Sequence, residues 1–286
     1  MKRMLLLLVL LLPLAALAEV HIGEIPPEDW AERELLRVTI LQTGRSDALL
    51  LECGGEAMLI DGGDASWAAA VQHDLEKRGL TSFRYFLNTH PHNDHIEGLI
   101  HLMQQDVLPE CFMSPFAADW HDGSYHDAAM QLAWEKGVRF RMVKSGDVYP
   151  LGAAQIHIYR TTAHTDMNSR SAIQLVAFGE SRLLLCADLT GLGQKALLEE
   201  LPQGALAAQI VKAPHHGENA IVTGFLDAVS PALLLCNSEA DEAPDLARQA
   251  ESRGLPLLFS GEGEIVLETD GTDWYVLQRE KTGRDR

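Results

Sequence analysis

The chain has 286 residues, of which 47% are hydrophobic, 22% charged and 6% aromatic. This ordinary globular composition excludes a disordered chain, a collagen-like repeat and a protein with many membrane spans. Lys and Arg total 23 against 41 Asp and Glu, and the resulting formal charge of -18 disfavours a nucleic-acid binder that relies on a basic surface.

The N-terminus has the three parts of a secretory signal peptide. Lys2 and Arg3 supply positive charge, residues 4–12 form an apolar run, and Ala16-Leu17-Ala18 is a small-residue cleavage site. The run is short for a bilayer span and Pro13 interrupts it, which favours cleavage over an uncleaved anchor. We therefore expect a signal peptide at 1–18 and a mature chain at 19–286. That chain would be secreted, periplasmic or at the cell surface, without stable membrane insertion.

Short β-type runs separated by glycine-containing turns open the mature chain and predict antiparallel strands. Alternation of strands and helices follows. In chain order, strands are expected at 36–41, 48–52, 57–60 and 84–89, with helices at 67–78 and 96–104. In the second half, strands are expected at 155–160, 172–178, 182–187, 209–212, 233–236, 256–259, 264–268 and 274–277, with helices at 194–201 and 245–253. No repeat, low-complexity tract or long linker divides the chain, which predicts one α/β domain with two sheets.

The densest chemical feature follows the predicted strand at 84–89. The sequence Thr89-His90-Pro91-His92-Asn93-Asp94-His95 places three imidazoles and a carboxylate within six residues. Imidazole and carboxylate together suit Zn²⁺, Mn²⁺ or Fe, whereas Ca²⁺ and Mg²⁺ prefer oxygen ligands. Two metal ions that share a water lower its pKa towards neutrality, so this loop predicts a hydrolytic metal site.

The four cysteines Cys53, Cys111, Cys186 and Cys236 are widely spaced and contain no CxxC pair, which argues against a structural zinc site made from them. An exported protein can form disulfides, yet Cys186 and Cys236 lie in apolar strand-like runs, where a buried free thiol is at least as plausible as a bridge. The sequence leaves their pairing open.

The HxHxDH motif after an apolar strand, with Leu59-Ile60-Asp61-Gly62-Gly63 before it, resembles the signature of the metallo-β-lactamase superfamily. Three later motifs resemble, in order, those of the soluble hydrolase domain of the ComEC competence proteins. These are Asn168-xx-Ser171, Leu183-Leu184-Leu185-Cys186-Ala187-Asp188 and Lys212-Ala213-Pro214-His215-His216-Gly217. The resemblance covers most of the mature chain and implies a four-layer αββα sandwich, the metallo-β-lactamase fold.

The resemblance also implies two divalent metal ions, with zinc expected and Mn or Fe as alternatives. His90 and His92 would bind one ion, Asp94 and His95 the second, Asp188 would bridge both, and His215 would be the last histidine of the second set. Ala163-His164-Thr165 resembles the GHT motif that supplies a third histidine in many superfamily members. The ComEC-like subgroup commonly lacks it, so His164 is either a ligand or an exposed loop residue.

Neighbouring residues each have more than one expected role. If the backbone is extended at His215-His216, the two rings point apart, and His216 is then expected to support the site or face the substrate rather than bind metal. Asp61 is expected either beneath the metal loop, bonded to a ligand imidazole, or as a turn residue. Lys212 and Arg170 could each hold an anionic substrate group, although a solvated surface charge is the default expectation for both. Residues 120–127 could form the rim of the site or a helix start capped by Ser124.

These features predict a metal-dependent hydrolase in which a metal-bound hydroxide attacks a phosphodiester or related ester, with Asp94 orienting the nucleophile. The negative charge of the chain favours a small-molecule substrate, or a short stretch of nucleic acid that is bound only at the metals. Two alternatives remain. One is hydrolysis of a β-lactam amide, and the other is a metal-binding module without catalysis.

Overall fold

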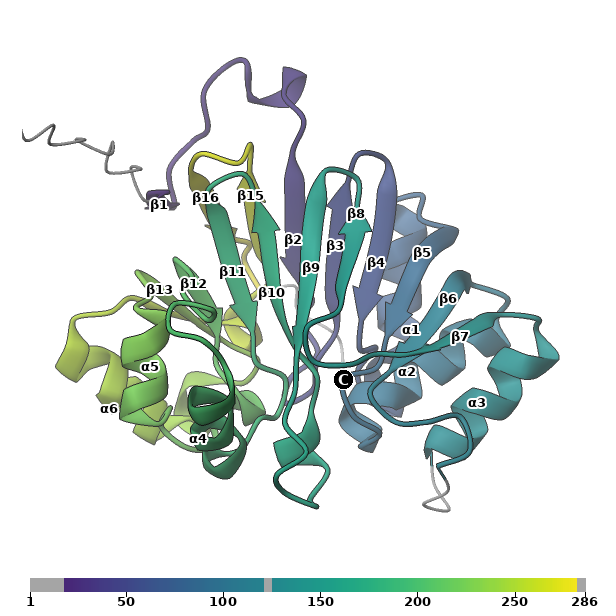
Figure 1. Ribbon diagram of the computed structural model, residues 1–286. Coiled ribbons are helices and arrows are strands. Elements are labelled where there is room, and N and C mark those ends of the chain that lie inside the picture. The colour runs from purple at the N-terminus through teal and green to yellow at the C-terminus, as the bar shows by residue number, and fades with distance from the viewer. Residues whose placement is uncertain (1–17, 121–124, 282–286) are drawn as a thin grey trace, which may run out of the picture.

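The structure is a computed structural model that describes residues 18–120 and 125–281. Two mixed sheets face each other at its centre, with helices on both outer sides (Figure 1). This is the four-layer αββα sandwich that the sequence predicted. The prediction of a signal peptide at 1–18 falls almost wholly outside the described residues, as does the predicted cap Ser124.

The first sheet has nine strands in the order β1-β16-β15-β2-β3-β4-β5-β6-β7. Their bounds are β1 Val20–Ile22, β2 Leu36–Ile40, β3 Leu49–Cys53, β4 Glu56–Ile60, β5 Ser82–Leu87, β6 Leu108–Ser114, β7 Arg139–Met142, β15 Ile265–Thr269 and β16 Trp274–Gln278. Three helices cover its outer face: α1 Ala65–Lys77, α2 Asn93–Gln104 and α3 Tyr125–Glu135.

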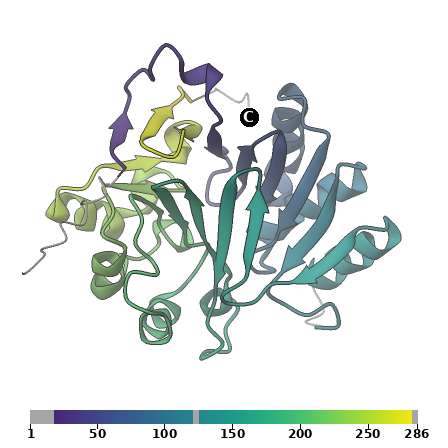
Figure 2. The ribbon, with the colours of Figure 1, turned by 45° about the horizontal axis from the view of Figure 1, so that its top comes forward.

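The second sheet has seven strands in the order β14-β13-β12-β11-β10-β9-β8. They are β8 Val148–Leu151, β9 Ala154–Tyr159, β10 Ile173–Phe178, β11 Ser181–Leu185, β12 Ile210–Lys212, β13 Leu233–Cys236 and β14 Leu257–Phe259. Its outer face packs against α4 Gly191–Glu200, α5 Thr223–Val229 and α6 Pro244–Arg253. Figure 2 shows the two sheets from above, each with its helices on the side away from the other.

Alternation of side chains along the strands explains the layers. In β2, Leu36, Val38 and Ile40 are fully buried and pack in the core between the sheets together with Leu183 and Leu185 of β11. The opposite faces carry a second apolar set, because helices cover them as well. Strands buried on both faces read as continuous apolar runs, which is why the sequence revealed most of them.

The topology gathers the ends of several parallel strands at one edge of the sandwich. β4 pairs with β5 and β5 with β6 in parallel, as do β11 with β12 and β12 with β13. The carboxyl ends of parallel strands lie at the same sheet edge, where ligand sites usually form. The loops that contain Asp61, the HxHxDH motif, Asp188 and His215 each follow one of these strands.

Helix α2 begins at Asn93, three residues before the predicted start, so Asp94 and His95 lie on its first turn rather than in a loop. The helix is held close to the turn after β4. A Cβ atom placed on Gly98 would lie 1.8 Å from the backbone oxygen of Gly62, so only glycine permits this approach.

The sequence did not predict β1, β6, β7, β8 or α5. The described residues contain no helix with both the length and the apolar character to cross a bilayer.

Candidate metal centre

Two groups of potential ligands share one carboxylate. Asp94, His95, Asp188 and His216 form the first group, and His90, His92 and Asp188 form the second, with the ligand atoms of each group within 4.8 Å of one another. Residues up to half the chain apart therefore converge, as the sequence predicted for all but His216. Because Asp188 belongs to both groups, the two positions for a cation are adjacent.

The group around His95 is deeply buried. His95 Nε2 lies 3.3 Å from Asp188 Oδ1, and His216 Nε2 lies 3.5 Å from the same oxygen. His216 Nε2 is also 3.2 Å from Oδ2 of Asp94, whose side chain is 28% exposed. Asp94 is thus the member of this group that faces the opening of the site.

The group around His90 lies on the other oxygen of Asp188. His90 Nε2 is 3.7 Å from Asp188 Oδ2 and 3.0 Å from Nδ1 of His92. His92 precedes the first residue of α2 with an extended backbone and is half-buried, whereas His90 is fully buried. The two oxygens of Asp188 therefore face different imidazole sets, which is the arrangement of a bridging carboxylate.

The central atoms lack ordinary partners. His95 Nε2, His216 Nε2 and Asp188 Oδ1 are buried and make no hydrogen bond among the described residues. A buried polar atom without a partner costs about 1–3 kcal/mol, so three such atoms facing one another call for an occupant. A divalent cation satisfies all three at once, and imidazole with carboxylate is a donor set that suits zinc or iron.

The electrostatics agree with that occupant. Burial by itself raises the pKa of Asp188, but the charges on His95 and His216 outweigh burial and lower the pKa well below its usual range. Burial lowers the pKa of His95 and of His216, yet the Asp188 carboxylate raises both well above the usual value. Protons on the imidazoles balance the carboxylate in the metal-free chain, and a bound cation would displace them.

Asp61 lies beneath the metal loop, which was the first of the two roles expected for it. Its Oδ1 accepts from the backbone N–H of Thr89 at 2.8 Å, and its Oδ2 accepts from the Thr89 hydroxyl at 2.6 Å. His95 Nδ1 lies 2.8 Å from Oδ2, so Asp61 orients the ring whose other nitrogen faces Asp188. A carboxylate in this position sets the tautomer of a ligand histidine and raises its basicity.

Asp47 supports the other imidazole of the buried group, and the sequence did not reveal it. Its Oδ1 lies 3.3 Å from His216 Nδ1, and its Oδ2 forms an ion pair with Lys212. Both partners of that ion pair are fully buried. The Asp47 backbone N–H also donates to the carbonyl of Asp94 at 3.1 Å, which connects the loop after β2 to the start of α2. Lys212 is therefore neither the solvated charge expected by default nor free to hold a substrate anion, because it is buried and Asp47 already neutralises it.

The roles expected for His215 and His216 need correction. The backbone is not extended there, since φ is 52° at His215 and 50° at His216. His216 is buried within the Asp94 group, whereas His215 is 29% exposed and belongs to neither group. His215 Nε2 nevertheless lies 3.7 Å from Asp188 Oδ2, the oxygen that His90 also faces. A single strand-end turn thus presents one imidazole to each side of Asp188.

His164 belongs to neither ligand group and lies in a partly exposed loop between β9 and β10. In the same loop, Asn168 Nδ2 lies 3.3 Å from Nε2 of His215. The Asn168-xx-Ser171 motif therefore reaches the site, while His164 does not join its ligand groups.

All four cysteines are free thiols, which resolves the open question of their pairing in favour of unbridged cysteines.

Comparison with known proteins accords with this geometry. Residues 41–231 match the model of the metallo-β-lactamase superfamily. The chain belongs to the metallo-β-lactamase superfamily. Most members are metal-dependent hydrolases, and the matched region contains every residue of the two ligand groups.

Two curated relatives are competence proteins, which confirms the resemblance to ComEC. The chain is 25% identical over 214 residues to the competence protein ComA of Neisseria gonorrhoeae, covering 74% of this chain and 28% of the relative. It is 27% identical over 150 residues to the ComE operon protein 3 of Bacillus subtilis (strain 168), covering 50% and 18%. The chain thus spans less than a third of the length of these relatives.

Solved structures share the fold at low sequence identity. The metallo-β-lactamase fold protein YhfI of Bacillus subtilis superposes with a TM-score of 0.52 at 12% identity, covering 79% of this chain and 96% of the other. CmlA, a diiron β-hydroxylase from Streptomyces venezuelae, gives 0.51 at 14% identity, covering 82% and 53%. At these identities the likeness concerns the fold alone.

Proposed function

We propose that this chain is an exported phosphodiesterase with a centre for two divalent metal ions, which we expect to be zinc. The observation that carries the proposal is the placement of Asp188, whose two oxygens face two separate imidazole sets. Two such ions would polarise a phosphoryl group and lower the pKa of a shared water, which is the chemistry they supply in hydrolases. The resemblance to the ComEC hydrolase domain favours a phosphodiester over a β-lactam.

The residues around that centre have separate roles. His95 and His216 are held from behind by Asp61 and Asp47, so their orientation is set before any ion binds. Asp94 is partly exposed, and its pKa is lowered: burial alone would raise it, but His216 and His95 outweigh that effect. An anionic carboxylate at the mouth of the site can accept a hydrogen bond from the attacking water and orient it.

We assign His215 to the same ion as His90 and His92, where it replaces the histidine expected at position 164. Its Nε2 faces the Asp188 oxygen that His90 faces, and Glu218 Oε2 lies 3.1 Å from its Nδ1. Glu218 would orient this imidazole as Asp61 orients His95. The first ion would then have three imidazoles and one oxygen of Asp188 as its protein ligands, a donor set that suits zinc.

Metal analysis and two substrates test the proposal on the purified chain. We expect two ions per chain and hydrolysis of bis(p-nitrophenyl) phosphate, with nitrocefin hydrolysed slowly or not at all. Asp188→Asn should lose at least one ion and lower phosphodiester turnover by about 100-fold, or about 2.7 kcal/mol of activation free energy. Asp227→Asn on exposed α5 is the matched control and should change neither. Faster turnover of nitrocefin than of the phosphodiester would overturn the substrate assignment.

Two alanine variants separate the candidate third histidines. His215→Ala should lower bound metal as well as turnover, whereas His164→Ala should leave both nearly unchanged. The reverse result would restore His164 as the ligand.

Export is tested separately. Mass spectrometry of material recovered outside the cytoplasm should show a chain that begins at Glu19. An intact Met1 in that material would contradict cleavage.

A further inference from the structure

Two arginines lie together on one aromatic ring beside the metal centre. The guanidinium carbon of Arg160 is 5.9 Å from the centroid of the Phe116 ring, and that of Arg170 is 5.1 Å from the same centroid. Trp120 packs on Phe116 at 4.3 Å between ring centroids. A ring face attracts each cation, but it does not neutralise either charge.

Neither cation has an acidic partner among the described residues. Among residues 18–120 and 125–281, Arg160 and Arg170 form no ion pair, although the chain has an excess of carboxylates. Arg160 is 8% exposed and donates to the carbonyl of Pro115, while its Nε is buried without a hydrogen-bond partner. Burial lowers the pKa of Arg160, and the charge of Arg170 lowers it further, so the two guanidinium groups repel each other.

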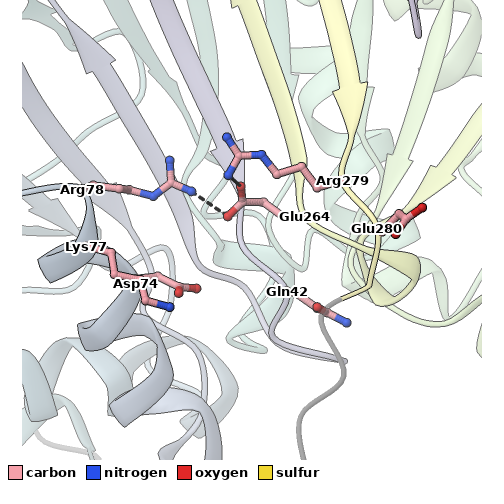
Figure 3. Close-up of a pocket in the computed structure, with 7 residues that line it drawn as sticks. All are labelled: Gln42, Asp74, Lys77, Arg78, Glu264, Arg279 and Glu280. Carbon is pink, nitrogen blue, oxygen red and sulfur yellow. Dashed lines mark hydrogen bonds and ion pairs between the residues drawn. The ribbon is translucent and has the colours of Figure 1, made fainter.

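Arginines elsewhere in the molecule show the usual arrangement. In a pocket between α1 and the C-terminal strands, Arg78 and Arg279 both converge on the carboxylate of Glu264 (Figure 3). Their Nη atoms lie 2.6 and 2.9 Å from its oxygens. There the protein supplies the anion between two arginines. At Arg160 and Arg170, no carboxylate of residues 18–120 or 125–281 takes that place.

Backbone connections place the arginine pair at the metal end of the sandwich. Arg170 lies two residues after Asn168, whose side chain reaches His215. Ala172 N–H donates at 3.0 Å to the carbonyl of Thr89, the residue before His90. Phe116 follows β6, the strand next to the one that ends at the metal loop. The loop between β9 and β10, which contains both arginines, lies at the foot of Figure 1.

We propose that Arg160 and Arg170, with the Phe116 ring beneath them, form a binding site for a phosphate group of the substrate other than the one hydrolysed. This inference rests on the proposed function and specifies its substrate, a molecule with at least two phosphates. Guanidinium groups bind phosphate through paired charge-assisted hydrogen bonds, and a buried Nε without a partner is a donor available for one of them. The site also gives a strongly acidic chain a local means of holding an anion.

Binding is tested first, without catalysis. The chain is treated with EDTA to remove metal and titrated with inorganic pyrophosphate by isothermal calorimetry. Arg170→Gln should weaken pyrophosphate binding at least tenfold, because it removes charge-assisted hydrogen bonds to the phosphate. Arg248→Gln on exposed α6 makes the same change of charge and should bind as the unaltered chain does. Equal affinity in the two variants, or no binding by the unaltered chain, would overturn the proposal.

Turnover is tested second, with the metal-loaded chain and two chromogenic esters. One is thymidine 3′-(p-nitrophenyl phosphate), and the other is the same ester with a 5′-phosphate. Arg170→Gln should lower kcat/KM about 10- to 100-fold for the ester with two phosphates, mainly through KM, and change it less than about twofold for the other. Equal effects on both esters would contradict a second phosphate site.

The two experiments separate this inference from the proposed function. Pyrophosphate binding that depends on Arg170, in a chain that hydrolyses no phosphodiester, would retain the anion site and reject the phosphodiesterase. If the chain hydrolyses phosphodiesters but Arg170→Gln behaves as Arg248→Gln does, the phosphodiesterase is retained and the anion site is rejected. Arg160→Gln is a supporting variant, because Arg160 is buried and its loss can disturb the fold; Arg170 is partly exposed and does not carry that difficulty.

Discussion

Replacing Lys212 with methionine should destabilise the protein more than a change at any exposed lysine. Lys212 is the last residue of β12 and is fully buried, and its ammonium group forms an ion pair with the equally buried Asp47. Burial raises the pKa of Asp47, but the charge of Lys212 outweighs burial, so the carboxylate is ionised at neutral pH. The Lys212→Met variant would leave that charge buried without its ammonium partner.

The expected cost follows from the burial of both partners. Removing one member of a buried ion pair costs about 3–5 kcal/mol, because the remaining charge keeps its desolvation penalty and loses its partner. The pair of Lys281 with Glu239 is the matched control, since its side chains are 53% and 42% exposed. Exposed pairs contribute about 0.2–1 kcal/mol, so Lys281→Met should cost less than about 1 kcal/mol.

The assay is urea unfolding in EDTA, so that metal binding does not add to the free energy of unfolding. A double variant tests the mechanism as well as the magnitude. Asp47→Asn with Lys212→Met removes both charges, and its cost should fall below the sum of the two single costs by about 1–3 kcal/mol. Additive costs, or a Lys212→Met variant as stable as Lys281→Met, would refute the view that a buried ion pair supports His216.

Three further outcomes are expected. His216→Ala should lose one metal ion per chain and almost all turnover, because His216 belongs to the buried ligand group; retention of both ions on metal analysis would exclude it as a ligand. Gly98→Ala should cost at least about 1–3 kcal/mol in urea unfolding, since its Cβ would meet the Gly62 carbonyl, whereas Gly224→Ala on α5 has room and should cost nothing. Burial raises the pKa of the Cys186 thiol to about 12, so iodoacetamide should label Cys186 only after unfolding; rapid labelling of the folded chain would show that it is accessible.

Much of the site could be predicted from the sequence, because its residues lie within short motifs at strand ends. His90, His92, Asp94 and His95 lie within six residues, so no long-range information was needed to group them. Asp188 ends an apolar run, where a carboxylate requires a partner. Most strands were also predictable, because a strand buried on both faces is apolar along its whole length, whereas the four-layer arrangement was expected from the family resemblance.

Other features depended on contacts that no local pattern encodes. The choice between His215 and His216 turned on two residues in left-handed backbone conformations, whereas the sequence argument assumed an extended chain. Asp47 and Lys212 each look like an ordinary charge at a strand end, and their pairing joins the two sheets across 165 positions of sequence.

The sequence by itself determined most of the candidate metal ligands, His216 excepted, and which strand ends would present them, since chemistry and periodicity are local properties. Only the tertiary structure decided which imidazole faces which oxygen of Asp188, and which charges are paired. Lys212, a candidate to hold substrate, is neutralised by Asp47, whereas Arg170 lies beside a second arginine and without a carboxylate partner among the described residues. Burial and pairing depend on the distance between residues remote in sequence, and folding alone sets that distance.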